Sequence, residues 1–121
     1  MRIFIIDDNQ IDLLISRKLL LKNNASLEVQ EYVQARQALA EIKTKQVEKP
    51  DIILLDLNMP EMDGWEFLEA LREENADADL KVYVLTSSLD DRDRTKAKKY
   101  NVVEGYLTKP LNDSVIQNIL A

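Results

Sequence analysis

The sequence contains neither cysteine nor histidine among its 121 residues. Without cysteine, the chain cannot form a disulfide, hold a metal through thiolates or attack a substrate with a thiol, and the composition suits a reducing compartment. Without histidine, it has no imidazole base, no histidine-bound zinc and no residue that could carry phosphohistidine. Any chemistry must therefore come from carboxylates, hydroxyls and the cationic side chains of lysine and arginine.

The sequence also lacks an excess of positive charge and any long apolar run. Its formal net charge of −6 argues against a general nucleic-acid binder, because neutralising phosphates requires a basic surface. No stretch approaches the ~20 apolar residues of a membrane-spanning helix. The apolar start, residues 3–6, runs into two aspartates and does not fit a signal peptide. We therefore expect a cytoplasmic protein that contacts neither nucleic acid nor membrane directly.

Apolar runs and helical patterns alternate along a length that suits one domain, residues 1–121. Each of five short runs, rich in Ile, Leu and Val, is followed by a helical pattern. The expected strands are residues 3–6, 26–33, 51–58, 80–85 and 103–107. Five strands alternating with five helices predict an α/β fold, with a parallel sheet, right-handed crossovers and helices on both faces.

The spacing of apolar residues indicates the buried side of some expected helices more clearly than of others. In the first, an apolar stripe at helical spacing predicts the side that packs on the sheet; it consists of Ile11, Leu14, Ile15 and Leu19. The second is expected over residues 35–47, with Ala38, Leu39 and Ile42 inward. The third carries an apolar side of Phe67, Leu68 and Leu71. Residues 90–99 are almost wholly charged, so the fourth helix should be the most loosely packed.

The apolar run at residues 51–58 indicates a strand buried on both faces, with Asp56 at its carboxyl end. In open α/β sheets, ligands bind beside the carboxyl ends of the strands. Asp56 is therefore a candidate for chemistry, although by itself it could equally cap the turn that follows.

Three other strands end in polar side chains: Asp7 and Asp8, Thr86, and Lys109. All these ends lie on one edge of a parallel sheet, where three carboxylates repel one another unless a cation lies among them. Oxygen ligands without nitrogen or sulfur favour a hard divalent ion, and Mg²⁺ fits best because it also binds phosphoryl oxygens. A carboxylate nucleophile, a metal and a lysine are the parts needed to form an aspartyl phosphate.

Five separated motifs in this order resemble the response-regulator receiver domains of two-component signalling. They are residues 5–8 (IIDD), 55–60 (LDLNMP), 62–64 (MDG), 85–87 (LTS) and 109–110 (KP). The resemblance covers essentially the whole chain. It implies a flavodoxin-like, doubly wound (βα)5 fold with strand order 2-1-3-4-5.

The resemblance also implies roles for the site residues. Asp56 would accept a phosphoryl group from the phosphohistidine of a sensor histidine kinase or a histidine phosphotransfer protein. Mg²⁺ would be held by the Asp8 and Asp56 side chains and the Asn58 backbone carbonyl, with Asp7 acting through water. Lys109 would pair with the phosphoryl group. The domain would promote its own phosphorylation and dephosphorylation, without turning over an external substrate.

Further implications concern switching. Thr86 would be coupled to Tyr106, and phosphorylation would change a surface formed by the fourth helix, fifth strand and fifth helix, which binds a downstream protein. Asn58 and Ser88 occupy the two positions that tune self-dephosphorylation in this family. The Lys109-Pro110 peptide bond is expected to be cis.

We expect a stand-alone, chemotaxis-regulator-like receiver whose output is contact with another protein or onward phosphotransfer. We also expect a monomer. The sequence leaves open whether phosphorylation drives dimerisation, how long the phosphoryl group lasts, which kinase and target are involved, and whether the natural protein continues past Ala121.

Three alternatives share parts of this pattern. A haloacid-dehalogenase-like phosphatase also uses a strand-end aspartate and Mg²⁺, but it needs a second acid where this chain has Asn58. A flavin-binding module needs a hydroxyl-rich loop where this chain has Asp7 and Asp8. A receiver-shaped interaction module that is never phosphorylated would not need the acidic set that the chain retains.

Overall fold

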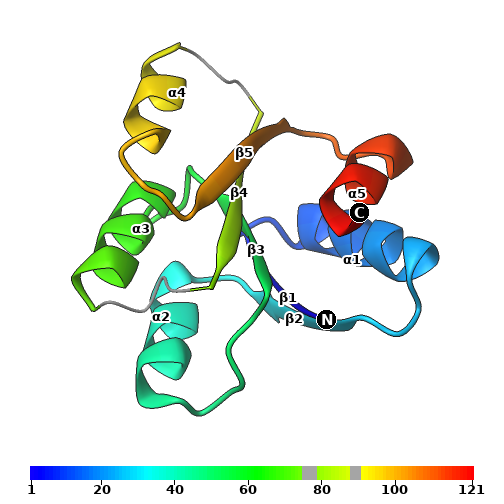
Figure 1. Ribbon diagram of the computed structural model, residues 1–121, viewed down its shortest axis with the longest axis horizontal. Coiled ribbons are helices and arrows are strands. Elements are labelled where there is room, and N and C mark those ends of the chain that lie inside the picture. Colours follow the sequence, from blue (N-terminus) through cyan, green and yellow to red (C-terminus); the bar gives the residue numbers. More distant parts are fainter. Residues whose placement is uncertain (75–78, 88–90) are drawn as a thin grey trace.

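The five strands form one parallel sheet in the order β2-β1-β3-β4-β5 (Figure 1). The computed structural model describes residues 1–74, 79–87 and 91–121. The strands are β1 (Arg2–Ile6), β2 (Glu28–Tyr32), β3 (Ile52–Asp56), β4 (Lys81–Thr86) and β5 (Val103–Thr108). This confirms the predicted flavodoxin-like fold, its strand order and the expected edge position of the strand within residues 26–33.

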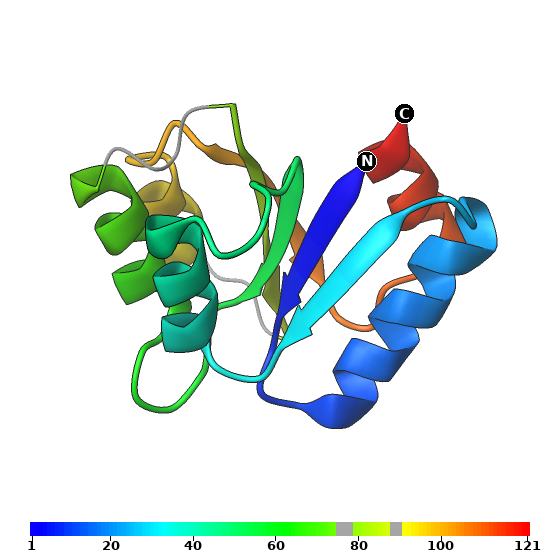
Figure 2. The same cartoon turned by 90° about the horizontal axis from the view of Figure 1, so that it is seen from below.

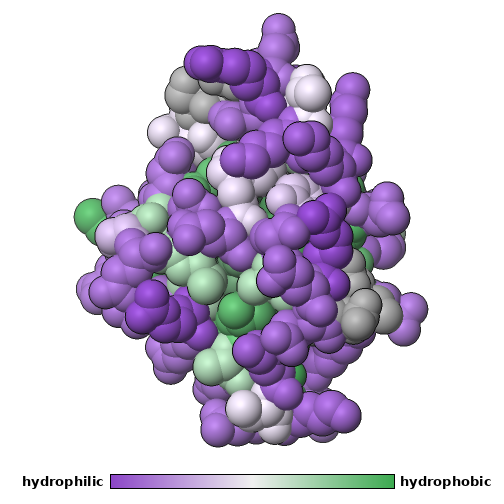
Figure 3. Space-filling model, turned by 90° about the vertical axis from the view of Figure 1, so that its left-hand side faces the viewer, coloured by the Kyte–Doolittle hydropathy of each residue, from purple (hydrophilic) through white to green (hydrophobic). Residues whose placement is uncertain are grey.

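Helices cover both faces of the sheet (Figure 2). They are α1 (Gln10–Asn23), α2 (Ala35–Thr44), α3 (Gly64–Glu73), α4 (Asp91–Ala97) and α5 (Asp113–Leu120). Helices α1 and α5 lie side by side on one face, and α2 and α3 pack together on the other, on the same side as α4. The outward surface of that second layer is mainly hydrophilic (Figure 3).

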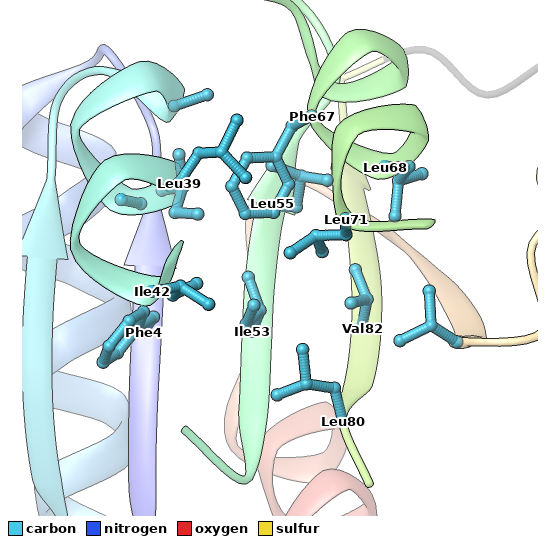
Figure 4. Close-up of a cluster of buried hydrophobic side chains, with 14 of the residues drawn as sticks. Phe4, Leu39, Ile42, Ile53, Leu55, Phe67, Leu68, Leu71, Leu80 and Val82 are labelled. Atoms are coloured by element: carbon cyan, nitrogen blue, oxygen red, sulfur yellow. The ribbon is translucent and has the colours of Figure 1, made fainter. Parts of the chain in front are cut away.

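Residues 3–6 of β1 and 52–55 of β3 are all apolar, as expected for central strands with both faces buried. Alternate side chains point to opposite faces of the sheet. Those packing toward α2 and α3 include Ile6. Phe4, Ile53 and Leu55 point the same way (Figure 4). Those packing toward α1 and α5 include Ile3, Ile5, Ile52 and Leu54. Burying each such side chain stabilises the fold by about 1.5–3 kcal/mol, so these two strands anchor the residues that follow them.

The predicted buried stripe of α1 is wrong for three of its four residues; the fourth, Leu19, is partly buried against the core. Ile11, Leu14 and Ile15 are 69%, 49% and 39% exposed, and the sheet is instead contacted by the side that carries Leu13, Ser16 and Leu20. Apolar residues occupy more than one side of this helix, so spacing alone could not choose among them.

The other helices agree more closely with the sequence. The predicted inward residues of α2 and α3 are buried, although α2 ends at Thr44, three residues before the predicted end, where Lys45 takes a left-handed conformation with φ of 58°. Helix α4 lies within residues 90–99 as predicted and is followed by buried Tyr100. In the described parts of the chain, no helix combines the length and apolar character needed to cross a membrane.

Candidate functional site

Asp56 is the last residue of β3 and is only 5% exposed. Its carboxylate accepts a hydrogen bond of 3.2 Å from the backbone N–H of Asn58, and the chain then turns toward α3. The turn is closed by the N–H of Gly64, which donates to the Leu57 carbonyl at 3.1 Å. A Cβ atom on Gly64 would lie 2.8 Å from the Asp56 carbonyl oxygen, so this close approach requires glycine.

Two further carboxylates follow β1. The N–H of Asp7 donates to the Tyr32 carbonyl at 3.0 Å, which fixes the end of β1 against β2. Asp7 is 1% exposed, whereas Asp8 is exposed. Each of Asp7, Asp8 and Asp56 offers an oxygen, and these oxygens all lie within 4.8 Å of one another. The predicted acidic cluster is therefore present at this edge of the sheet.

Lys109 follows β5 and brings a positive charge into this cluster. Its Nζ lies 2.8 Å from Asp7 Oδ2, 3.0 Å from Asp12 Oδ2 and 3.7 Å from Asp56 Oδ2. Its backbone N–H donates to the Thr86 carbonyl at 2.9 Å, and the Lys109-Pro110 bond is cis, as predicted.

Among the described partners of Lys109, Asp12 is the one that the strand-end pattern does not predict. It lies in the first turn of α1 rather than directly after a strand. The sequence signal is its distance from the helix start, because Asp12 lies three residues after Asn9, the N-cap, and so falls in the first turn, close to where β1 ends.

The predicted switch residues, Thr86 on β4 and Tyr106 on β5, are not opposite each other in the pairing of these two strands. Thr86 is the last residue of β4 and is buried, while Tyr106 is opposite Val84, two residues earlier along the strand. The Tyr106 hydroxyl donates to the Arg94 carbonyl at 2.8 Å, and the Arg94 guanidinium carbon lies 5.6 Å from the centre of the tyrosine ring. Tyr106 therefore faces α4 in this structure. Ser88 lies outside the described residues.

Burial and charge shift the protonation of the site. Burial, followed by the neighbouring charge of Asp7, raises the pKa of Asp56 to about 7, against the opposing effects of the Asn58 N–H and Lys109. Burial alone would lower the pKa of Lys109, but hydrogen bonds to Asp7 and Asp12 outweigh it and raise that pKa. Without a second cation, the three carboxylates are under-compensated, and Asp56 tends to retain a proton near neutral pH.

The donor set suits a hard divalent cation. Three carboxylates with closely spaced oxygens, and no nitrogen or sulfur ligand, match the preference of Mg²⁺ for oxygen. A cavity of about 640 Å³ lies elsewhere, lined by residues 42, 43, 45–49 and 74 at the opposite edge of the sheet, and contains none of these groups. Among the described residues, the acidic edge is therefore the candidate site for a divalent cation.

Comparisons with known proteins agree with this geometry. Residues 3–121 match the response regulator receiver domain family. The chain is 32% identical over 119 residues to the two-component response regulator ARR10 of Arabidopsis thaliana, covering 98% of this chain and 20% of that protein. It covers 7% to 28% of the length of three other curated relatives.

Solved structures give the same result. A two-component response regulator from Cytophaga hutchinsonii is 27% identical, with a TM-score of 0.88 and coverage of 98% of this chain and 92% of that one. The phosphorylated cyanobacterial phytochrome response regulator RcpA is 28% identical, with a TM-score of 0.82 and coverage of 98% and 87%. This family consists of signalling domains rather than enzymes that turn over a separate substrate. The chain belongs to the response regulator receiver domain family of two-component signalling.

Proposed function

We propose that Asp56 accepts a phosphoryl group from the phosphohistidine of a sensor histidine kinase or a histidine phosphotransfer protein. The observation that carries this proposal is the position of the Asp56 carboxylate, which shares one sheet edge with Asp7, Asp8 and the Lys109 ammonium. The phosphorylated state of the similar regulator RcpA supports it. The exposed apolar side chains of α1, the helix that follows Asp7 and Asp8, offer the donor protein a surface beside this edge.

The transfer exchanges one bond to phosphorus for another. An ionised Asp56 oxygen attacks the phosphorus atom, an O–P bond forms, and the P–N bond to the donor histidine breaks. The departing imidazole nitrogen keeps the electron pair and takes a proton from solvent. Asp56 must be ionised to attack, so positive charge beside it favours the reactive form.

Mg²⁺ fits this site, where it would supply positive charge that lowers the repulsion between the incoming phosphoryl group and the carboxylates. In our proposal, Asp8 and Asp56 hold it with their side chains, Asn58 with its backbone carbonyl, and Asp7 through water. Lys109 then donates to a phosphoryl oxygen, as a lysine commonly does for phosphate.

The output rests on Thr86 and Tyr106. When the Thr86 hydroxyl turns toward the phosphoryl group, Tyr106 turns inward and gives up its hydrogen bond to the Arg94 carbonyl. The surface of α4, β5 and α5 then changes and binds a target protein. Asn58 and Ser88 adjust how long the phosphoryl group persists. We propose that residues 1–121 perform these steps as a single cytoplasmic domain, monomeric before phosphorylation.

The test is intact mass spectrometry after incubation with Mg²⁺ and acetyl phosphate, with Asp56→Asn as the matched control. We expect one added phosphoryl group on the wild type, none on the variant, and none after chelation of the metal. An adduct on both proteins would mean that another residue is the acceptor. If the wild type gains no adduct and does not bind beryllofluoride, a mimic of the phosphoryl group, the proposal is overturned.

A further inference from the structure

The Lys109 ammonium is held by two carboxylates that are not the proposed phosphoacceptor. Its distances to Asp7 and Asp12 are 2.8 and 3.0 Å, whereas Asp56 Oδ2 is 3.7 Å away, beyond ordinary hydrogen-bonding distance. An ammonium has three N–H donors, so two of them are already used. The lysine that should serve the phosphoryl group is therefore already paired, with Asp7 after β1 and with Asp12 on α1.

Asp12 lies in a well-defined first helical turn, so its carboxylate can compete with a phosphoryl group for the Lys109 ammonium. The side chain of Asn9 caps α1 and accepts hydrogen bonds from the N–H groups of Ile11 and Asp12, at 2.9 and 3.1 Å. These bonds fix the first turn of the helix, and Asp12 is only partly exposed. Its pair with Lys109 is thus screened less by water than a pair on the open surface.

Asp7 and Asp12, the two partners of Lys109, should behave differently when a divalent cation binds at the site. A divalent cation among the carboxylates competes with Lys109 for Asp7, which belongs to that cluster. Asp12 is outside the cluster and keeps its full charge for the lysine. It also adds negative charge next to the place where the phosphoryl group must lie.

We propose that Asp12 is a positioning residue that holds the Lys109 ammonium away from Asp56 and so weakens the affinity of the site for a phosphoryl group. This inference rests on the function proposed above. It assigns to this chain a restraint on phosphorylation in which a helix residue, and not a strand-end residue, sets the position of the lysine.

The decisive variant is Asp12→Asn, which keeps the side-chain shape and a hydrogen-bond acceptor but removes the charge. Beryllofluoride is titrated at saturating Mg²⁺ and followed by amide NMR spectra. We expect the variant to bind beryllofluoride about tenfold more tightly, the order of effect of one hydrogen bond between charged groups that is partly screened by solvent. Asp12→Glu, which restores the charge, should return the affinity toward that of the wild type.

Asp113→Asn is the matched control. Asp113 makes the same kind of ion pair, 2.9 Å from Lys22 Nζ, and Lys22 lies ten residues and so about 15 Å along α1 from Asp12. This variant should bind beryllofluoride as the wild type does. An equal gain in both variants would show a general effect of net charge and overturn the proposal.

A second readout needs neither metal nor phosphoryl mimic. The ¹⁵N signal of a hydrogen-bonded lysine ammonium is visible by NMR when its proton exchange is slow. We expect the same Lys109 signal in the wild type and in Asp113→Asn, and a signal at a different chemical shift in Asp12→Asn, where Asp7 remains the only charged partner of the two. Unchanged beryllofluoride affinity in Asp12→Asn, with a wild type that binds, overturns this inference alone; a wild type that neither binds nor forms an adduct overturns the proposed function as well.

Discussion

Asp56 has a protonation state that depends strongly on its surroundings. Its pKa in the folded protein is about 7, compared with 3.8 for a free carboxyl group. Between these two values the folded protein holds a proton that the unfolded chain releases. The metal-free fold therefore loses stability as pH rises from about 4 to 7, and the loss is complete above pH 7.

Asp56→Asn removes this effect and should stabilise the metal-free protein. At pH 8 we expect its free energy of unfolding to exceed that of the wild type by about 1–3 kcal/mol, and the difference should shrink toward pH 4. Urea denaturation in the presence of a chelator measures both. Adding Mg²⁺ should stabilise the wild type more than the variant. An advantage that does not change with pH would show that the charge of Asp56 is not its cause.

The sequence could predict which residues form the site only where the order of strands and helices determines their position. Asp7, Asp56 and Lys109 could be assigned to one edge because each ends or follows a strand of a parallel sheet. Asp12 could not be assigned in this way, since its position depends on where α1 begins. The orientation of Tyr106 toward Arg94 also depends on packing against α4, which spacing along a strand does not specify.

The connection between β3 and α3 is the element most constrained by its sequence. Gly64 lies so close to β3 that a Cβ would approach the Asp56 carbonyl oxygen to 2.8 Å and the Leu57 Cα to 2.9 Å. Both are main-chain atoms and cannot move aside as the end of a side chain could. The residue that starts α3 therefore also holds Asp56 in place.

Gly64→Ala should destabilise the protein by about 1–3 kcal/mol, the usual range for overpacking. It should also displace Asp56 and slow its phosphorylation. Gly105→Ala is the control, because its Cβ would meet only the Tyr83 ring at 3.5 Å, an ordinary contact. Urea denaturation of the two variants checks this prediction. Equal stability of both variants would mean that the turn can shift without strain.

Among the elements, strands buried on both faces were easier to predict than amphipathic helices. The apolar runs of β1 and β3 have one structural solution, because a strand without polar residues must be covered on both sides. Helix α1 carries apolar residues on its exposed side as well, as with Ile11, and its inward side includes Ser16. Only packing against the sheet and α5 selects the buried side.

On the scale of the whole molecule, aromatic side chains of β5 and α3 contact α4. Tyr106 contacts α4 through the Arg94 carbonyl. From the same helix, Lys96 Nζ lies 4.9 Å from the centre of the Trp65 ring, and that ring stacks on Tyr100 with 6.4 Å between the ring centres. Trp65 is the single tryptophan of the chain, so its fluorescence reports how α4 lies against α3.

Binding of beryllofluoride with Mg²⁺ should change the fluorescence of Trp65, because inward rotation of Tyr106 frees α4 and alters the contact with Lys96. Asp56→Asn should give no change.

Tyr106→Phe loses the hydrogen bond to the Arg94 carbonyl. Its fluorescence without ligand should therefore already lie nearer the value of the activated wild type, and its free energy of unfolding should fall by about 0.5–1.5 kcal/mol. In Lys96→Met the response should be smaller. If wild-type fluorescence stays constant while beryllofluoride binds, α4 keeps its place on α3, and the signal must leave the site by another surface.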